Sequence, residues 1–113
     1  MRIWDIEPKC LCNKHLVAEH RELHGLWNIL TIHGGEGGYS KHPETLRWVG
    51  KAKALYLRHE NLIVEFTSRG FKHNTPLDEK LAIGESSQEV YINTPAEQEE
   101  ILKLKQCDCL LHL

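Results

Sequence analysis

One apolar stripe at helical spacing constrains the fold of this chain more than any other feature. At 100° per residue, five large apolar side chains between residues 13 and 32 fall within about 100° of arc. These side chains are Leu16, Leu23, Leu26, Trp27 and Leu30. Asn13 is a suitable N-cap, and the glycine-rich stretch HGGEGGYS that follows Ile32 cannot continue a helix. We therefore expect an amphipathic helix from about Asn13 to about Ile32, with one face in the core.

The same helix carries six ionisable side chains within ten residues, namely His15, Glu19, His20, Arg21, Glu22 and His24. Glu19 falls inside the apolar stripe, and His15 and Glu22 fall at its edge, so these three line one side of the helix. A buried carboxylate must be paired or have its pKa raised. Glu19 therefore belongs either to an acid/base site with Glu22 and His15, or to a structural ion pair with His15 or a basic residue of another helix.

A second helical region is expected over about residues 44–69, directly after Pro43, which suits a first helical turn. Gly50 can kink or divide this region, and Gly70 suits its C-terminal end. The positions expected to face the core are Ala52, Tyr56, His59, Ile63 and Phe66. We interpret His59 as a core histidine whose hydrogen bonds are satisfied.

A third helix is expected to begin in the stretch NTPAEQEEILKLK, with Thr94 as N-cap, Pro95 at N1 and Glu97 at N3, which completes a capping box. Its apolar positions Ile101, Leu102 and Leu104 give it one inner face. The stretch QEVYIN could form a short strand, but a sheet partner is not evident. The sequence predicts an all-α fold: a single compact domain over residues 1–113, with three main helices and long connectors.

Composition agrees with a folded domain, since 41% of the 113 residues are hydrophobic and 27% are charged. The sequence has no apolar run near the roughly 20 residues that span a bilayer, and MRIWDIEPK lacks the apolar core of a signal peptide. We expect a cytoplasmic monomer with no membrane partner.

Charge and cysteine spacing leave alternatives open. Residues 39–73 hold seven basic and three acidic side chains, a net charge of +4, which indicates either a cationic surface for a polyanion or an ordinary solvated helix. The four cysteines form two C-x-C pairs, Cys10/Cys12 and Cys107/Cys109, a spacing that is weak evidence for zinc. We expect ordinary thiols, no bound metal and no cofactor; if the chain ends meet, the pairs could share a zinc ion or form disulfides.

The stretch HLVAEHREL at residues 15–23 resembles the first-helix signature of the pyrimidine dimer DNA glycosylases, the phage-type endonuclease V repair enzymes. YLRHENLIVEFTSRGF resembles the second helix of that family, and HP at residues 42–43 and TPAEQEEIL fit the positions before its second helix and at its third. The resemblance implies an all-α fold of three helices, as the residue pattern predicts.

The resemblance also implies a bifunctional DNA glycosylase and AP lyase. In this family a free N-terminal α-amine attacks C1′ of the damaged nucleotide, the base leaves, and the resulting imine leads to strand cleavage by β-elimination. The matching catalytic residues are Met1, which we expect to be retained before the large Arg2, and Glu22. Arg2, His15, Glu19 and Arg21 match supporting residues. An α-amine has a pKa of about 7.7–8.0, so a useful fraction is neutral and nucleophilic near pH 7.

Damaged double-stranded DNA is the partner that the resemblance implies, with a nucleotide extruded to expose its sugar. Candidate phosphate contacts are Arg2, Lys14, Arg21, Arg47, Lys51 and Lys53, and His24 and His33 could add charge at lower pH. Two alternatives stay open. With eight histidines and two C-x-C pairs, the chain could be a small metal-binding or non-enzymatic nucleic-acid-binding domain. It could also be a related lyase that acts on another lesion or on RNA.

Overall fold

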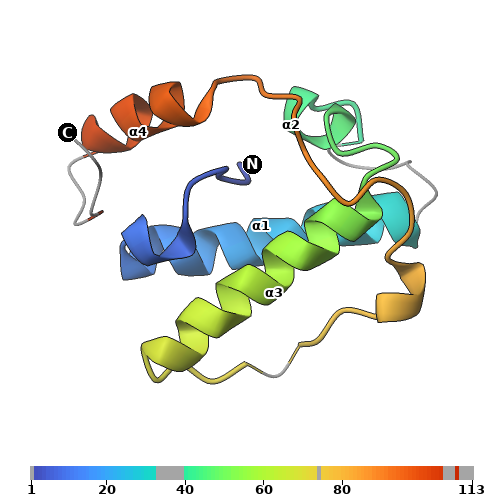
Figure 1. Ribbon diagram of the computed structural model, residues 1–113, viewed down its shortest axis with the longest axis horizontal. Coiled ribbons are helices and arrows are strands. Elements are labelled where there is room, and N and C mark those ends of the chain that lie inside the picture. Colours follow the sequence, from blue (N-terminus) through green and yellow to red (C-terminus); the bar gives the residue numbers. More distant parts are fainter. Residues whose placement is uncertain (1, 33–39, 74, 106–108, 110–113) are drawn as a thin grey trace.

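Two long helices, α1 (Asn13–Thr31) and α3 (Ala52–Ser68), cross each other and form the body of the protein (Figure 1). The computed structural model describes residues 2–32, 40–73, 75–105 and 109. Its other helices are the short α2 (Pro43–Leu46), α4 (Pro95–Lys103), and the 3-10 turns η1 (Pro8–Cys10) and η2 (Glu79–Leu81). The structure therefore confirms the predicted all-α fold.

The core lies between α1, α3 and the N-terminal segment, which we define as residues 2–7. The predicted stripe of α1 is buried at Leu16, Leu23, Leu26 and Trp27, and Leu30 packs against the core from a half-buried position. The opposing fully buried residues are Leu55 and Leu62 of α3, Leu102 of α4 and Ile3 of the N-terminal segment. In Figure 1 this segment, drawn in blue, lies between α1 and α4.

Helix α1 begins one residue earlier than a cap at Asn13 requires. Cys12 occupies the N-cap position with extended backbone, and Asn13 is the first helical residue, so the prediction of an Asn13 cap is wrong. The Asn13 side chain has a different role, because its Oδ1 accepts a hydrogen bond of 2.8 Å from Arg69, just past the end of α3. This bond ties the start of α1 to the end of α3.

The predicted second helix is divided at Gly50, which has φ +77°. Its first part is the single turn α2, where the His42 ring accepts from the backbone of Glu44. Helix α3 has no side-chain cap; instead, its N–H groups at residues 53 and 54 donate to the carbonyls of Ile83 and Glu85 at 2.9 and 3.0 Å. A distant segment therefore satisfies the N-terminus of α3 and fixes the division.

The remaining helix ends follow the predicted chemistry. Gly70 ends α3 with φ +77°, and the N–H of Phe71 returns to the carbonyl of Phe66 at 2.8 Å, as in a Schellman motif. Thr94 and Glu97 form the predicted capping box at α4. The stretch QEVYIN does not form a strand; in the part of the chain that the structure describes, the single β-bridge joins Lys51 to Gly84.

Candidate active site

Glu19 is buried to 1% exposure in the stripe of α1, as its position on the wheel predicted. The Arg58 guanidinium of α3 donates to both of its carboxylate oxygens, at 2.7 and 2.9 Å. The backbone N–H of Trp4 also favours the charged form of this carboxylate. Burial raises the pKa of Glu19, and the Arg58 charge and these hydrogen bonds oppose that rise. Of the two interpretations left open by the sequence, the structure supports the ion pair with another helix.

Two arginines hold the N-terminal segment by its carbonyls. Arg58 donates to the carbonyl of Ile6 at 2.8 Å, and Arg47 donates to the carbonyl of Ile3 at 2.9 Å. Between them, the backbone of Asp5 donates to the Gln98 side chain of α4 at 2.7 Å, and that side chain donates back to the Asp5 carboxylate at 2.8 Å. The backbone of the segment is therefore fixed at residues 3 to 6, directly after the expected nucleophile.

Arg47 has this structural role in place of the predicted phosphate contact. Its side chain is only 3% exposed and forms ion pairs with Asp5 and Glu44, at 2.9 and 2.7 Å. It also donates to the carbonyl of Val90 at 2.9 Å. Because these acceptors occupy the guanidinium inside the protein, Arg47 has no free face for DNA. Asp5, which is distant in sequence, and Glu44, which lies three residues before Arg47, neutralise this charge inside the protein.

Glu22 lies half-buried on α1, one turn beyond Glu19. Within the described ranges, Glu22 forms no ion pair. Arg21 is exposed beside it. Met1, the expected nucleophile, lies outside the described residues.

His15 lies on the same side of α1 as Glu19 and Glu22, and it contacts both the N-terminal segment and Cys109. Its ring makes an edge contact with Trp4, with centroids 6.1 Å apart. Its Nδ1 lies 3.2 Å from the Sγ of Cys12 and 3.4 Å from the Sγ of Cys109. One member of each C-x-C pair therefore meets at His15, and Cys107 lies outside the described residues. Burial lowers the pKa of His15, and the nearby charges of Lys105 and Lys14 lower it further.

The other predicted contacts are scattered. Arg2 is half-buried, with its guanidinium over the Trp4 ring at 5.1 Å and a hydrogen bond of 3.0 Å to Asn93. Lys14 and Lys53 are exposed.

Lys51 donates to Gln88 at 2.8 Å, which ties it to the 86–91 connector. His24 packs among other histidines of α1, α3 and the connector after α3. His33 lies outside the described residues.

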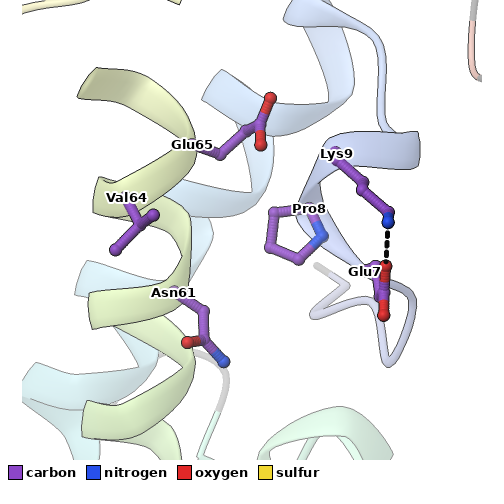
Figure 2. A pocket seen from close by; sticks show the side chains of 6 residues that line it. All are labelled: Glu7, Pro8, Lys9, Asn61, Val64 and Glu65. Carbon is purple, nitrogen blue, oxygen red and sulfur yellow. Dashed lines mark ion pairs between the residues drawn. The ribbon is translucent and has the colours of Figure 1, made fainter. Parts of the chain in front are cut away.

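Two pockets follow the N-terminal segment and η1. One, of about 310 Å³, lies between η1 and α3; in Figure 2 the Pro8 ring stands between the α3 side chains and the exposed ion pair of Lys9 with Glu7. A larger one, of about 460 Å³, is lined by Trp4, Arg58 and Tyr91 among others. Its volume lies in the range of small-molecule sites.

Sequence reasoning missed Arg58 as the partner of Glu19. A signal was present, because Arg58 lies within about 60° of both Leu55 and Leu62 on the helical wheel of α3, where a basic residue needs an acidic partner. Trp4 and Gln98 were missed as well. The sequence contained no comparable signal for them, since their roles depend on contacts between residues that are distant in sequence.

None of the described helices combines the length and apolar character that crossing a bilayer requires. No curated protein and no solved structure was found to match the chain. The family model of pyrimidine dimer DNA glycosylase matches residues 1–79, which include α1, α2, α3 and the whole N-terminal segment. Because this match covers well over half of the 113 residues, the chain belongs to the pyrimidine dimer DNA glycosylase family.

Proposed function

We propose that this DNA glycosylase excises pyrimidine dimers from duplex DNA through an imine formed by the α-amine of Met1, and then cuts the strand as an AP lyase. Family membership supplies the class, a DNA-repair glycosylase with a DNA substrate. The mechanism and the residues are the proposal. We further propose that the protein acts as a monomer.

The observation that carries the proposal is the anchoring of the N-terminal segment on α1. Trp4 lies against α1, where its ring contacts His15 and its backbone N–H favours the charged form of the Glu19 carboxylate. Glu22 follows Glu19 by three residues on the same helix, about 4.5 Å along its axis. Residue 1 precedes Trp4 by three residues, which span at most about 11 Å. Three residues of chain are therefore long enough to bring the nitrogen of residue 1 to the Glu22 carboxylate.

The two glutamates of α1 have different roles in this scheme. Glu19 is buried and its carboxylate is occupied by Arg58, which also binds the carbonyl of Ile6, so Glu19 is a positioning residue that holds the N-terminal segment through Arg58. Glu22 is half-buried with no ion pair in the described ranges, so its carboxylate is available to a substrate. We assign Glu22 to the chemistry and Glu19 to the framework.

The reaction balances with these groups alone. The neutral amine donates its electron pair to C1′ of the damaged nucleotide, the glycosidic bond breaks, and the base leaves with the bonding electrons and gains a proton. The nitrogen loses its two protons, the C1′–O4′ bond of the sugar ring breaks, and O4′ gains a proton, which leaves an imine between the enzyme and C1′. Removal of a C2′ proton then expels the 3′ phosphate by β-elimination. Glu22 stabilises the cationic sugar and carries protons in these steps.

Of the predicted phosphate contacts, Lys14, Arg21 and Lys53 are exposed and available to the DNA backbone. Arg2 and Lys51 could join them only by leaving Asn93 and Gln88, their present partners. Such contacts give affinity that falls with added salt. We therefore expect binding of undamaged duplex to weaken steeply as salt concentration rises.

Borohydride trapping tests the proposal directly. Reduction of the imine should join enzyme and ultraviolet-irradiated duplex covalently, and an acetylated α-amine or an N-terminal extension should abolish this adduct. Glu22→Gln should lower trapping and cleavage strongly, whereas Glu89→Gln, in an exposed connector position, should leave both unchanged. Trapping that survives a blocked α-amine would refute the assigned nucleophile, and an unchanged rate in Glu22→Gln would remove that residue from the mechanism.

The substrate is tested in the same assay with three nucleic acids. We expect cleavage of irradiated duplex and of abasic duplex, and none of single-stranded RNA. Cleavage of abasic duplex alone would replace the dimer glycosylase with an AP lyase. Cleavage of RNA in preference to both would assign the chain to a different lyase activity.

A further inference from the structure

Four histidines from three parts of the chain converge on one point. His20 and His24 lie one turn apart on α1, His59 lies on α3, and His73 lies in the connector after α3. One ring nitrogen from each of the four lies within 4.8 Å of all the others. The Nε2 atoms of His20 and His24 are 3.1 Å apart.

His59 adds a buried nitrogen without a hydrogen-bond partner to this cluster, among the residues that the structure describes. Its side chain is fully buried, and its Nδ1 lies 3.0 Å from the carboxylate of Glu60, an acceptor, so Nδ1 carries the proton. Its Nε2 therefore presents a lone pair. This buried nitrogen has no hydrogen-bond partner in the described part of the chain. A satisfied core histidine was expected here; the structure confirms the burial but leaves one nitrogen unsatisfied.

We propose that His20, His24, His59 and His73 form a four-imidazole site for a divalent transition-metal ion, with Zn²⁺ as the expected occupant. Zinc binds histidine nitrogen at about 2.0–2.1 Å in tetrahedral geometry, which places ligand nitrogens about 3.3 Å apart. The 3.1 Å between His20 and His24 is close to that value, and the 4.8 Å limit for the set leaves only small side-chain movements. An all-nitrogen set favours zinc, copper or nickel over magnesium or calcium.

The surroundings of the cluster suit a neutral imidazole site. The Glu60 carboxylate lies against the Nδ1 of His59. In many metal sites a carboxylate in this position orients the histidine that binds the metal. The Thr75 hydroxyl lies 3.3 Å from the Nε2 atoms of both His24 and His73, at the edge of the cluster. A pocket of about 360 Å³, lined by His20 and His73, gives an ion a path of entry.

From its position, the proposed site would stabilise the packing of α1 against α3. His20 and His24 each lie two residues from Glu22, which is about 160° around the helix on either side. The proposed metal therefore lies on the opposite side of α1 from the carboxylate assigned to the chemistry. It would join α1, α3 and the connector after α3 at one point, and so hold the packing of the two long helices.

Metal analysis of the full-length protein tests this site. Because Cys12, His15 and Cys109 also lie close enough together to bind a metal, the background for the measurement is Cys12→Ser/Cys109→Ser. After EDTA treatment and addition of Zn²⁺, this protein should retain about one equivalent. The His24→Gln and His73→Gln variants should each lose it, and Lys72→Gln, an exposed neighbour of His73, should keep it.

Cobalt gives a second readout that does not depend on activity. Co²⁺ bound by four imidazoles in a tetrahedral site should give visible d–d absorption without thiolate-to-metal charge transfer, and Zn²⁺ should displace it. Zn²⁺ should also raise the Tm of the background protein and of Lys72→Gln but not that of His73→Gln. Folded protein that retains no zinc and gives no cobalt spectrum would overturn the proposal, as would metal that remains in both histidine variants.

Discussion

Replacing Arg58 with methionine would leave the Glu19 carboxylate buried without its charge partner. The Glu19 side chain is 0% exposed, and Arg58 supplies two hydrogen bonds to it and a third to the carbonyl of Ile6. Removal of one member of a buried ion pair costs about 3–5 kcal/mol. For a chain of 113 residues, about 4 °C of Tm corresponds to each kcal/mol, so we expect a fall of roughly 12–20 °C.

The loss should depend on pH with a definite sign. Without Arg58, burial raises the pKa of Glu19 further, so the folded state holds a proton that the unfolded state releases. Such a group contributes stability below its unfolded pKa, and that contribution is lost as pH rises through the folded pKa. Arg58→Met should therefore be closer to the wild-type protein near pH 5 than near pH 8.

Urea unfolding at the two pH values measures both effects. The double variant Glu19→Gln/Arg58→Met removes the unpaired buried charge. It should recover a large part of the unfolding free energy that Arg58→Met loses, and its stability should depend little on pH. Lys9→Met, which breaks the exposed pair with Glu7, is the control and should unfold like the wild-type protein. A loss below about 1 kcal/mol in Arg58→Met, or a loss that is equal at both pH values, would refute the reasoning.

Three further changes test the framework by urea unfolding. Thr94→Ala removes the capping box of α4 and should cost about 1 kcal/mol; an unchanged midpoint would mean that α4 contributes no stability there. Gly84→Ala places a Cβ against the carbonyl oxygen of Gly50, at a residue with φ +90°. Gly70→Ala adds its Cβ in open space and should cost roughly 1–2 kcal/mol, so Gly84→Ala should cost more. Equal losses in the two variants would contradict the contact between residues 84 and 50. Arg47→Lys keeps the positive charge but loses most of the guanidinium hydrogen bonds to carbonyl and carboxylate oxygens, and should cost about 2–3 kcal/mol of unfolding free energy. A loss within experimental error would show that the charge alone is sufficient.

Periodicity was sufficient to predict the helices and the burial of Glu19, because both depend on local spacing along one helix. The sequence indicated a possible division at Gly50 but could not establish it, because the carbonyl groups that cap α3 come from the distant residues 83 and 85. Arg47 was misjudged for a related reason. Its charge was counted with a basic region, whereas Asp5, more than 40 residues away, and Glu44 neutralise it inside the protein.

The histidines show the same limit. The i, i+4 spacing of His20 and His24 is visible in the sequence, but it is typical of many solvated helices. Only the crossing of α1 and α3 brings His59 to them, and only the turn after Gly70 returns His73. A cluster assembled from three elements cannot be read from the spacing within one of them.

The hydrogen bonds between Asp5 and Gln98 join residues 93 positions apart. During synthesis residues 2–7 leave the ribosome well before Arg47, Arg58 and Gln98, the side chains on which they dock. Contacts of such long sequence separation form slowly, because loop closure must be completed before they stabilise anything. The N-terminal segment of a nascent chain would therefore stay undocked until residue 98 has been made, so its anchoring is a late step of folding.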